Sequence, residues 1–291
     1  MVDPDLPSKI RTVIKEPHGA VNRLNTDRIP LCLPPNATSP SLYALGFSRY
    51  AEIYLGFEEA WQTQLATPPI TPSQTSMPPD ERIRTILRNI YIPELHRSNR
   101  VKADLNFLPN LPNTNISNTN TGQEFRAYIN SRISDKPHLL VAYVWIMYSA
   151  LFNGGRWIRG LLCDAGPKFW GLEEGQLHVW KEGRYPPPLS FWQVEGERGG
   201  DDGGVRDEFR MRVVEADEFL TEGERQEILD ETLEIFKWCE RITRELDRDV
   251  AEMYGLAESS DESSDSVDEK LSWSDWMDIG RRLLSYLTGW N

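Results

Sequence analysis

Residues 138–162 read HLLVAYVWIMYSALFNGGRWIRGLL, a long apolar stretch of helical character that contains the pair Gly154-Gly155. Glycine costs a helix interior about 0.5–1 kcal/mol relative to alanine, so two in succession need a physical reason. One reason is a kink, because glycine pairs are a known cause of helix bending. The other is the close approach of something flat and bulky to a backbone without side chains. This stretch alone leaves both explanations open.

The composition sets limits on the kind of protein. The chain has 291 residues, 39% of them hydrophobic, and a net charge of −13. This length suits one large domain with appendages. The acidic charge disfavours nucleic acid as the main partner, because phosphates need a basic surface. No apolar run reaches the length of about 18 residues that a membrane-spanning helix needs, and the N-terminus lacks the apolar core of a secretory signal.

The cysteines indicate the compartment. Cys32, Cys163 and Cys239 are odd in number and widely spaced, which fits neither a disulfide framework nor a zinc site. We therefore expect an intracellular, cytoplasmic protein, and the sequence leaves a peripheral association with a membrane surface open.

Helical spacing of apolar residues recurs along most of the chain. It predicts helices at 10–24, 41–64, 79–107 with a break near Pro93, 122–134, 205–220 and 221–253. Thr221 and Glu224 have the spacing of a capping box and mark the start of the last helix. We predict an all-α domain over residues 9–254, after an N-terminal tail at 1–8 and with an irregular insertion at about 171–204.

The C-terminal region differs from the domain. Residues 255–270 are rich in serine and acidic residues and predict a solvated linker, because such a composition buries too little surface to fold. Residues 271–291 form an amphipathic segment that is too short and too charged to span a bilayer. This segment either docks back on its own domain, or it binds a partner or a membrane surface.

The histidines lack the spacing of a multidentate metal site. His18, His96, His138 and His178 form no His-x-x-x-His or Cys/His cluster. We expect a structural, hydrogen-bonded role for His96 beside Arg97 and a surface position for His138. His18 is different in kind, because a single axial imidazole is enough for a heme iron whose other nitrogens come from the porphyrin.

Two basic pairs accompany these apolar helices. Arg11 and Lys15 lie one turn apart on the helix that carries His18, and Arg206 and Arg210 repeat that spacing on a later helix. The two propionates of a heme require cationic partners of this kind. Ordinary solvated helix faces explain the same pairs, so their spacing does not decide the matter.

Other classes of site are poorly supported. The chain has no nucleophile elbow, phosphate-cradling loop or dinucleotide fingerprint. Glu58 and Glu59 are present, but a carboxylate-bridged di-iron site also needs a Glu-x-x-His motif, which the sequence lacks.

Taken in order, five segments resemble the heme oxygenase family. They are IRTVIKEPHGAVNRL at 10–24, SRYAEIYLGFEEAW at 48–61, PELHRSNRVKADLNFL at 93–108, MYSALFNGGRW at 147–157 and FRMRVVEADEFLTEGERQEILDETLEIF at 209–236. Each motif is weakly specific, but their order covers nearly the whole domain. The resemblance implies a multi-helical all-α bundle with heme between a proximal helix and a kinked distal helix.

The resemblance also implies a set of site residues. By this match His18 is the axial iron ligand, and Gly154 and Gly155 form the distal face beside Asn153. The other heme contacts implied are Arg11, Lys15, Tyr148, Arg206, Arg210 and Phe236.

The activity implied by the resemblance is oxidative degradation of heme b, which serves as both substrate and cofactor. Dioxygen and electrons from an external NADPH-dependent reductase would convert it to biliverdin, CO and iron. Two positions depart from the family pattern: Leu151 stands where the distal motif usually has Asp, and Asn22 where the proximal helix often has Glu. Because of the first departure, the glycine pair predicts heme binding more securely than heme cleavage. The second departure predicts weaker support of the His18 ring. A non-catalytic heme sensor or carrier, and a helical interaction protein that keeps only the fold, are the alternatives.

Overall fold

The computed structural model describes residues 4–67, 79–108, 119–173, 185–194 and 203–254. Every regular element in these ranges is a helix, which confirms the all-α prediction for this part of the chain. The predictions for residues 255–270 and 271–291 lie outside the described residues, as does His178.

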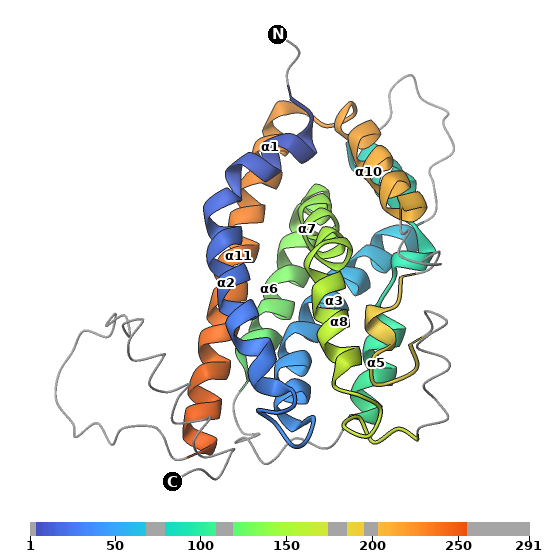
Figure 1. The fold of residues 1–291 in the computed structure, drawn as a ribbon. Coiled ribbons are helices and arrows are strands. Elements are labelled where there is room, and N and C mark those ends of the chain that lie inside the picture. Colours follow the sequence, from blue (N-terminus) through green and yellow to red (C-terminus); the bar gives the residue numbers. More distant parts are fainter. Residues whose placement is uncertain (1–3, 68–78, 109–118, 174–184, 195–202, 255–291) are drawn as a thin grey trace, which may run out of the picture.

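The arrangement of the helices is shown in Figure 1. The α-helices are α1 (Leu6–Val13), α2 (Lys15–Arg28), α3 (Ser41–Ala66), α4 (Pro79–Ile90), α5 (Ser98–Phe107), α6 (Thr121–Asp135), α7 (Leu140–Phe152), α8 (Gly154–Asp164), α10 (Gly203–Asp217) and α11 (Glu222–Met253). Short 3-10 turns lie at η1 (Ile29–Cys32), η2 (Pro93–Leu95), η3 (Pro137–Leu139) and η5 (Ser190–Trp192). The predicted break near Pro93 is confirmed, because η2 separates α4 from α5.

The single N-terminal helix predicted at 10–24 is wrong, because two helices meet at Ile14, where ψ is 0°. α1 begins at Leu6, which is fully buried, and the Asp5 side chain accepts a hydrogen bond from the Ser8 backbone N–H. Pro17 is the third residue of α2, where a backbone N–H would have no intrahelical partner. The proline therefore fits the first turn of a new helix instead of bending a continuous one.

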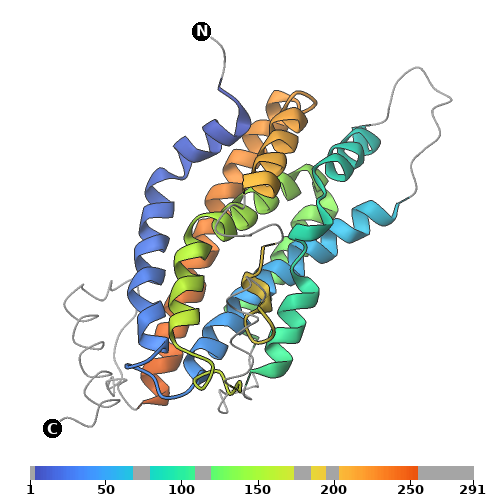
Figure 2. The ribbon, with the colours of Figure 1, turned by 45° about the vertical axis from the view of Figure 1, so that its right-hand side comes forward.

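The core forms around α7, which is apolar on all sides and almost completely buried. α3, α10 and α11 pack against it, and α3 also packs along α6. The rotated view shows α11 running along one side of the bundle next to α2 (Figure 2). α7 is thus held on several sides, whereas α2 lies on the outside of the molecule.

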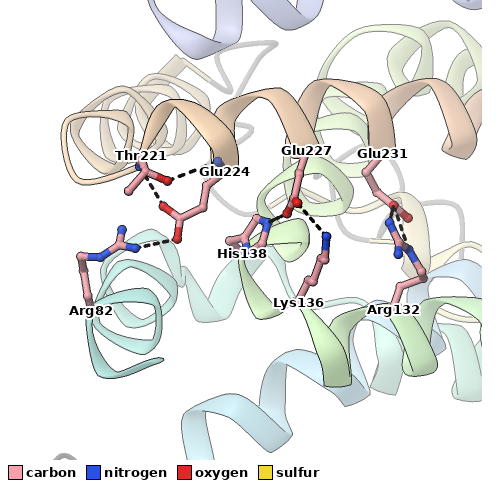
Figure 3. A network of polar contacts seen from close by, with 8 residues as sticks. All are labelled: Arg82, Arg132, Lys136, His138, Thr221, Glu224, Glu227 and Glu231. Carbon is pink, nitrogen blue, oxygen red and sulfur yellow. Dashed lines mark hydrogen bonds and ion pairs between the residues drawn. The ribbon is translucent and has the colours of Figure 1, made fainter. Parts of the chain in front are cut away.

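The start of α11 confirms the predicted capping box. The Glu224 backbone N–H donates to Thr221 Oγ1 at 3.3 Å, and the Thr221 backbone N–H donates to Glu224 Oε2 at 2.8 Å. Arg82 of α4 forms an ion pair with the same carboxylate at 2.6 Å (Figure 3). Local capping and a long-range ion pair therefore fix the first turn together.

The surface position predicted for His138 is wrong. His138 is 8% exposed in the turn η3, and its Nε2 lies 2.7 Å from Glu227 Oε2 on α11 (Figure 3). Lys136 donates to the other oxygen of the same carboxylate at 2.6 Å. The histidine joins the loop before α7 to α11, a contact that its sequence neighbours do not indicate.

Residues 185–194, which lie within the predicted insertion, contain the turn η5 but no α-helix, and they are firmly packed. Buried Asp104 of α5 accepts hydrogen bonds from the backbone N–H groups of Ser190 at 3.0 Å and Phe191 at 2.7 Å. Burial raises the pKa of the Asp104 carboxyl to about 6, although its hydrogen bonds act in the opposite direction. We call residues 185–194 the strap, because they bind α5 on one side and approach α8 on the other.

Candidate functional site

The distal helix is kinked, but not at the glycines themselves. α7 ends at Phe152, and Asn153 breaks the helix with φ −105° and ψ −87° before α8 begins at Gly154. The Asn153 side-chain amide donates to the Ser149 carbonyl at 2.8 Å, which caps the end of α7. The glycine pair therefore forms the first turn after the kink.

The two glycines differ in their surroundings. A Cβ atom on Gly155 would lie 3.2 Å from the Ala150 carbonyl oxygen and 3.6 Å from the Trp192 ring of the strap. Packing inside the protein therefore explains why residue 155 is glycine. Gly154 is exposed, and a Cβ atom there would meet nothing within 4 Å. Among the residues that the structure describes, packing gives no reason for glycine at position 154.

An exposed face begins where the core helix ends. Ala150, Asn153, Gly154 and Trp157 are all exposed, and their spacing places them along one side of the kinked helix. Leu151 is 3% exposed and belongs to the hydrophobic core. The position where the family pattern has Asp therefore points into the core in this chain, while its neighbours form the open face.

His18 lies on α2 with an exposed side chain. Its ring meets the buried Phe236 ring of α11 edge-on, with the centroids 6.0 Å apart. Within the described ranges, the imidazole makes no hydrogen bond or ion pair. Asn22, one turn further along α2, is exposed and does not contact the ring through a hydrogen bond. The imidazole is thus available on both nitrogens.

Some of the basic residues predicted to bind propionates lie close together in the structure. The pKa of the Asp5 carboxyl is lowered first by the hydrogen bond from Ser8 and also by the charges of Arg210 and Arg11. These arginines come from α10 and α1, so the structure brings members of both predicted pairs to the same end of the molecule. Lys15 is exposed and lines an open hollow along α2 that also includes Arg23. Arg206 lies 3.3 Å from its exposed neighbour Asp207.

Tyr148 lies apart from these residues. It is 2% exposed, and its hydroxyl donates to Glu58 Oε1 at 2.9 Å in the interior. Oε2 of Glu58 also lies 3.1 Å from Nδ1 of His96, so this histidine faces a buried carboxylate in the interior. His96 Nε2 is buried and has no hydrogen-bond partner among the described residues.

Sequence reasoning missed the cluster built around Glu58. This fully buried carboxylate accepts hydrogen bonds from the backbone N–H groups of Arg97 and Ser98 and from the Ser98 hydroxyl at 2.6 Å. The Arg97 guanidinium donates to carbonyl groups of residues 94 and 95 and of the strap, and burial lowers its pKa to about 10. The cluster joins α3, α5, α7 and the strap behind the exposed distal face.

Two further findings concern membrane spans and metal sites. No helix among the described residues is long and apolar enough to cross a membrane. The same residues contain no group of three or more His, Cys, Asp or Glu side chains that could hold a metal ion.

Comparisons with known proteins identify the fold. No protein-family model matches the sequence, and no curated protein matches it. Solved structures do match. Heme oxygenase from Leptospira interrogans has a TM-score of 0.58 at 19% identity and covers 83% of this chain and 100% of its own. Heme oxygenase-1 from the cyanobacterium Synechocystis in complex with heme has a TM-score of 0.58 at 18% identity, over 87% of this chain and 97% of its own.

A third solved structure supports the same fold. Heme oxygenase 2 from Chlamydomonas reinhardtii without heme has a TM-score of 0.60 at 15% identity, over 83% of this chain and 97% of its own. At these identities the likeness concerns the arrangement of the helices. The chain has the all-α fold of the heme oxygenases.

Proposed function

We propose that this protein binds heme between α2 and the kinked α7–α8 helix, with His18 as the axial ligand of the iron. The observation that carries the proposal is the bare surface at Gly154, where glycine has no packing role in the protein itself. A flat ligand that must approach the backbone closely supplies the missing reason. His18 fits the other side of such a ligand, because its exposed imidazole has no competing hydrogen bond within the described part of the chain.

The cations fit the two propionates. Arg11, Lys15 and Arg210 are exposed, and Arg206 lies one turn before Arg210 on α10. Arginine and lysine form charge-assisted hydrogen bonds with carboxylates, so these side chains would orient the heme edge. Phe236 would form part of the pocket wall, because its ring already contacts the ring of His18. Tyr148 would act from the interior, by supporting α7 through Glu58.

The reaction that fits this fold best is oxidative degradation of heme to biliverdin, CO and iron, with dioxygen and electrons from an external NADPH-dependent reductase. Bound heme supplies the iron that activates dioxygen and is itself the substrate. Among the four residues assigned to the exposed distal face, Asn153 carries the polar side chain. Gly154 and Gly155 would let the backbone approach the reacting oxygen, and the exposed side chains of Asn153 and Arg156 flank the pair in sequence.

A second function, non-catalytic heme carriage or sensing, is favoured by one observation. Leu151 occupies the position of the usual distal Asp, and its side chain is buried in the core. Leucine at position 151 therefore supplies no carboxylate to organise water for proton delivery. The third candidate, an interaction protein that keeps only the fold, predicts no heme binding at all.

One experiment separates these functions. Hemin is titrated into the purified protein, and a reductase with NADPH is then added under air while the absorption spectrum is followed. Conversion to biliverdin with release of CO supports the oxygenase, whereas a stable one-to-one complex without turnover supports the carrier or sensor. Failure to bind hemin stoichiometrically would contradict both.

A control is needed for the missing Asp. Leu151→Asp would place a carboxylate in the core, so its free energy of unfolding must be measured before its turnover is interpreted. If the variant stays folded and produces biliverdin faster, the missing carboxylate limits turnover in the natural chain.

A further inference from the structure

α2 and α11 lie side by side and run in the same direction (Figures 1 and 2). Three side-chain contacts join them at a nearly constant separation in sequence. His18 contacts Phe236 and Asn25 contacts Thr243, each pair 218 residues apart, and Arg28 contacts Asp247, 219 residues apart. The two helices are therefore in parallel register, and we call these three contacts the rungs.

The last rung is the strongest. Arg28 Nε lies 2.6 Å from Asp247 Oδ1 and Arg28 Nη2 lies 2.7 Å from Asp247 Oδ2, a bidentate arrangement. The two side chains are only 22% and 10% exposed. A bidentate guanidinium–carboxylate pair in this setting fixes orientation as well as distance. It therefore sets the position of the C-terminal end of α2 along α11.

The middle rung, between Asn25 and Thr243, also involves Tyr50 of α3. The Tyr50 hydroxyl lies 2.8 Å from Thr243 Oγ1 and 3.3 Å from Asn25 Oδ1. Thr243 also donates to the Cys239 carbonyl one turn earlier on α11. Three helices thus meet at one partly buried phenol, which holds α2 at the same register as the last rung does.

The first rung differs from the other two, because the His18 ring has an aromatic contact and no hydrogen bond among the residues described. Metal-binding histidines usually donate their second N–H to a carboxylate or carbonyl group, which orients the ring. Asn22, the residue one turn away, makes no such bond here. The imidazole therefore depends on the helix backbone for its position.

Starting from the proposed heme function, we infer that Asp247 and Thr243 are positioning residues: they hold α2 in register on α11 and thereby place His18 for the iron. The rise of a helix makes this placement sensitive, because a slip of one turn moves a side chain by about 5.4 Å. α2 begins directly after the break at Ile14. The rungs near its C-terminal end therefore determine most of its position along α11.

The test compares two acid-to-amide changes on α11. Asp247→Asn removes the charge that pairs with α2. Glu224→Gln is the matched control, because Glu224 also binds one arginine at 2.6 Å but joins α11 to α4, and glutamine still serves in a capping box. Amide hydrogen exchange in α2 is measured on both proteins without hemin. We expect faster exchange in α2 of Asp247→Asn and unchanged exchange in α2 of the control.

The second readout uses hemin. We expect hemin to dissociate about tenfold faster from Asp247→Asn, the size typical of lost support around a metal ligand, with a mixture of axial-ligand spectra. Asp247→Glu should restore much of the wild-type behaviour, and Thr243→Val should give a smaller change in the same direction.

The outcomes distinguish the two proposals. Unchanged exchange in α2 of Asp247→Asn would overturn the positioning role, even if hemin binds normally. Faster exchange together with unchanged hemin dissociation and spectrum would show that the rungs hold the helix but do not place His18. If the wild-type protein fails to bind hemin, the proposed function fails, and hydrogen exchange still decides whether the rungs hold α2.

Discussion

The two helices proposed to face the heme are supported in opposite ways. Nearly every residue of α7 is buried, and the Glu58 cluster and the strap lie behind its kinked end. α2 has Val21 as its one buried residue and is held by spaced rungs on α11. The distal side is therefore part of the stability core, whereas the proximal side is an outer helix whose position can be adjusted. Substitutions in the buried part of the distal side should mainly change stability, whereas those on the proximal side and at the exposed Gly154 should mainly change ligand binding.

The largest effect is expected from Glu58→Ala. Removing this buried carboxylate leaves two backbone N–H groups and two hydroxyl groups without their acceptor, so we expect the free energy of unfolding to fall by about 3–5 kcal/mol. Urea denaturation measures the change.

Glu59, the residue next to Glu58, provides the control for this substitution. Glu59 is 59% exposed and pairs with Arg126 on the surface, so Glu59→Ala should cost about 0.5 kcal/mol or less. Equal effects of the two substitutions would show that the Glu58 cluster does not support the distal side.

The next largest effect is the dependence of stability on pH that Asp104 causes. The pKa of Asp104 in the folded protein is about 6, above the unfolded value of 3.8, because burial penalises its charged form. The folded state therefore holds a proton that the unfolded state releases, and this contribution to stability is lost as the pH rises through about 6. It amounts to about 2–3 kcal/mol between pH 4 and pH 7.

Asp104→Asn should remove this pH dependence, although it also costs stability because an amide N–H₂ would face the Phe191 backbone N–H. Urea unfolding of both proteins between pH 4 and pH 7.5 measures the difference in slope. Parallel pH profiles would mean that the Asp104 carboxyl does not titrate in this range.

The glycine pair gives a smaller but more specific effect. Gly155→Ala brings a Cβ atom to 3.2 Å from the Ala150 carbonyl oxygen, and we expect a loss of about 1–2 kcal/mol in stability. In Gly154→Ala the new Cβ atom has no neighbour within 4 Å, so stability should stay unchanged or rise by up to about 1 kcal/mol. The same variant should bind hemin about tenfold more weakly. Thermal unfolding and hemin titration separate the two. Unchanged hemin affinity in Gly154→Ala would remove the main support for a ligand at this face.

The smallest effect on stability is expected on the proximal side. Asn22 is exposed, so Asn22→Glu should change the free energy of unfolding by less than about 0.5 kcal/mol. A carboxylate one turn after His18 can accept its N–H, so hemin should dissociate more slowly. Stopped-flow transfer of hemin to an acceptor protein measures the rate, with Asn22→Gln as the uncharged control. Equal rates for the two variants would contradict an orienting role for this position.

Local signals in the sequence were enough for most of the fold. Helices α3, α6 and α11 begin and end within a few residues of their predicted limits, because apolar spacing and the Thr221 capping box are local properties. The kink was predicted from Gly154-Gly155, but Asn153 provides the break, since its side chain caps Ser149. The split at Ile14 was missed because α1 is held by distant contacts, such as that of the Leu6 N–H with Asp217.

The site was less predictable than the fold. His138 and Glu227 are 89 residues apart, and Asp104 and Ser190 are 86 residues apart, so no local pattern pairs them. The sequence identified Leu151 as a departure from the family pattern, but the difference in exposure between Leu151 and Ala150 became visible only in the fold. The same holds for the two glycines, which are alike in sequence and unlike in their surroundings.

The central claim, heme held by His18 opposite the bare distal face, is tested most directly by the axial-ligand spectrum of the hemin complex. Hemin is added to the wild-type protein and to His18→Ala, and imidazole is then added to the variant. The account predicts a one-to-one histidine-ligated complex for the wild type, loss of that spectrum in His18→Ala and its return with imidazole. A wild-type spectrum in His18→Ala, or no stoichiometric binding by the wild-type protein, would contradict it.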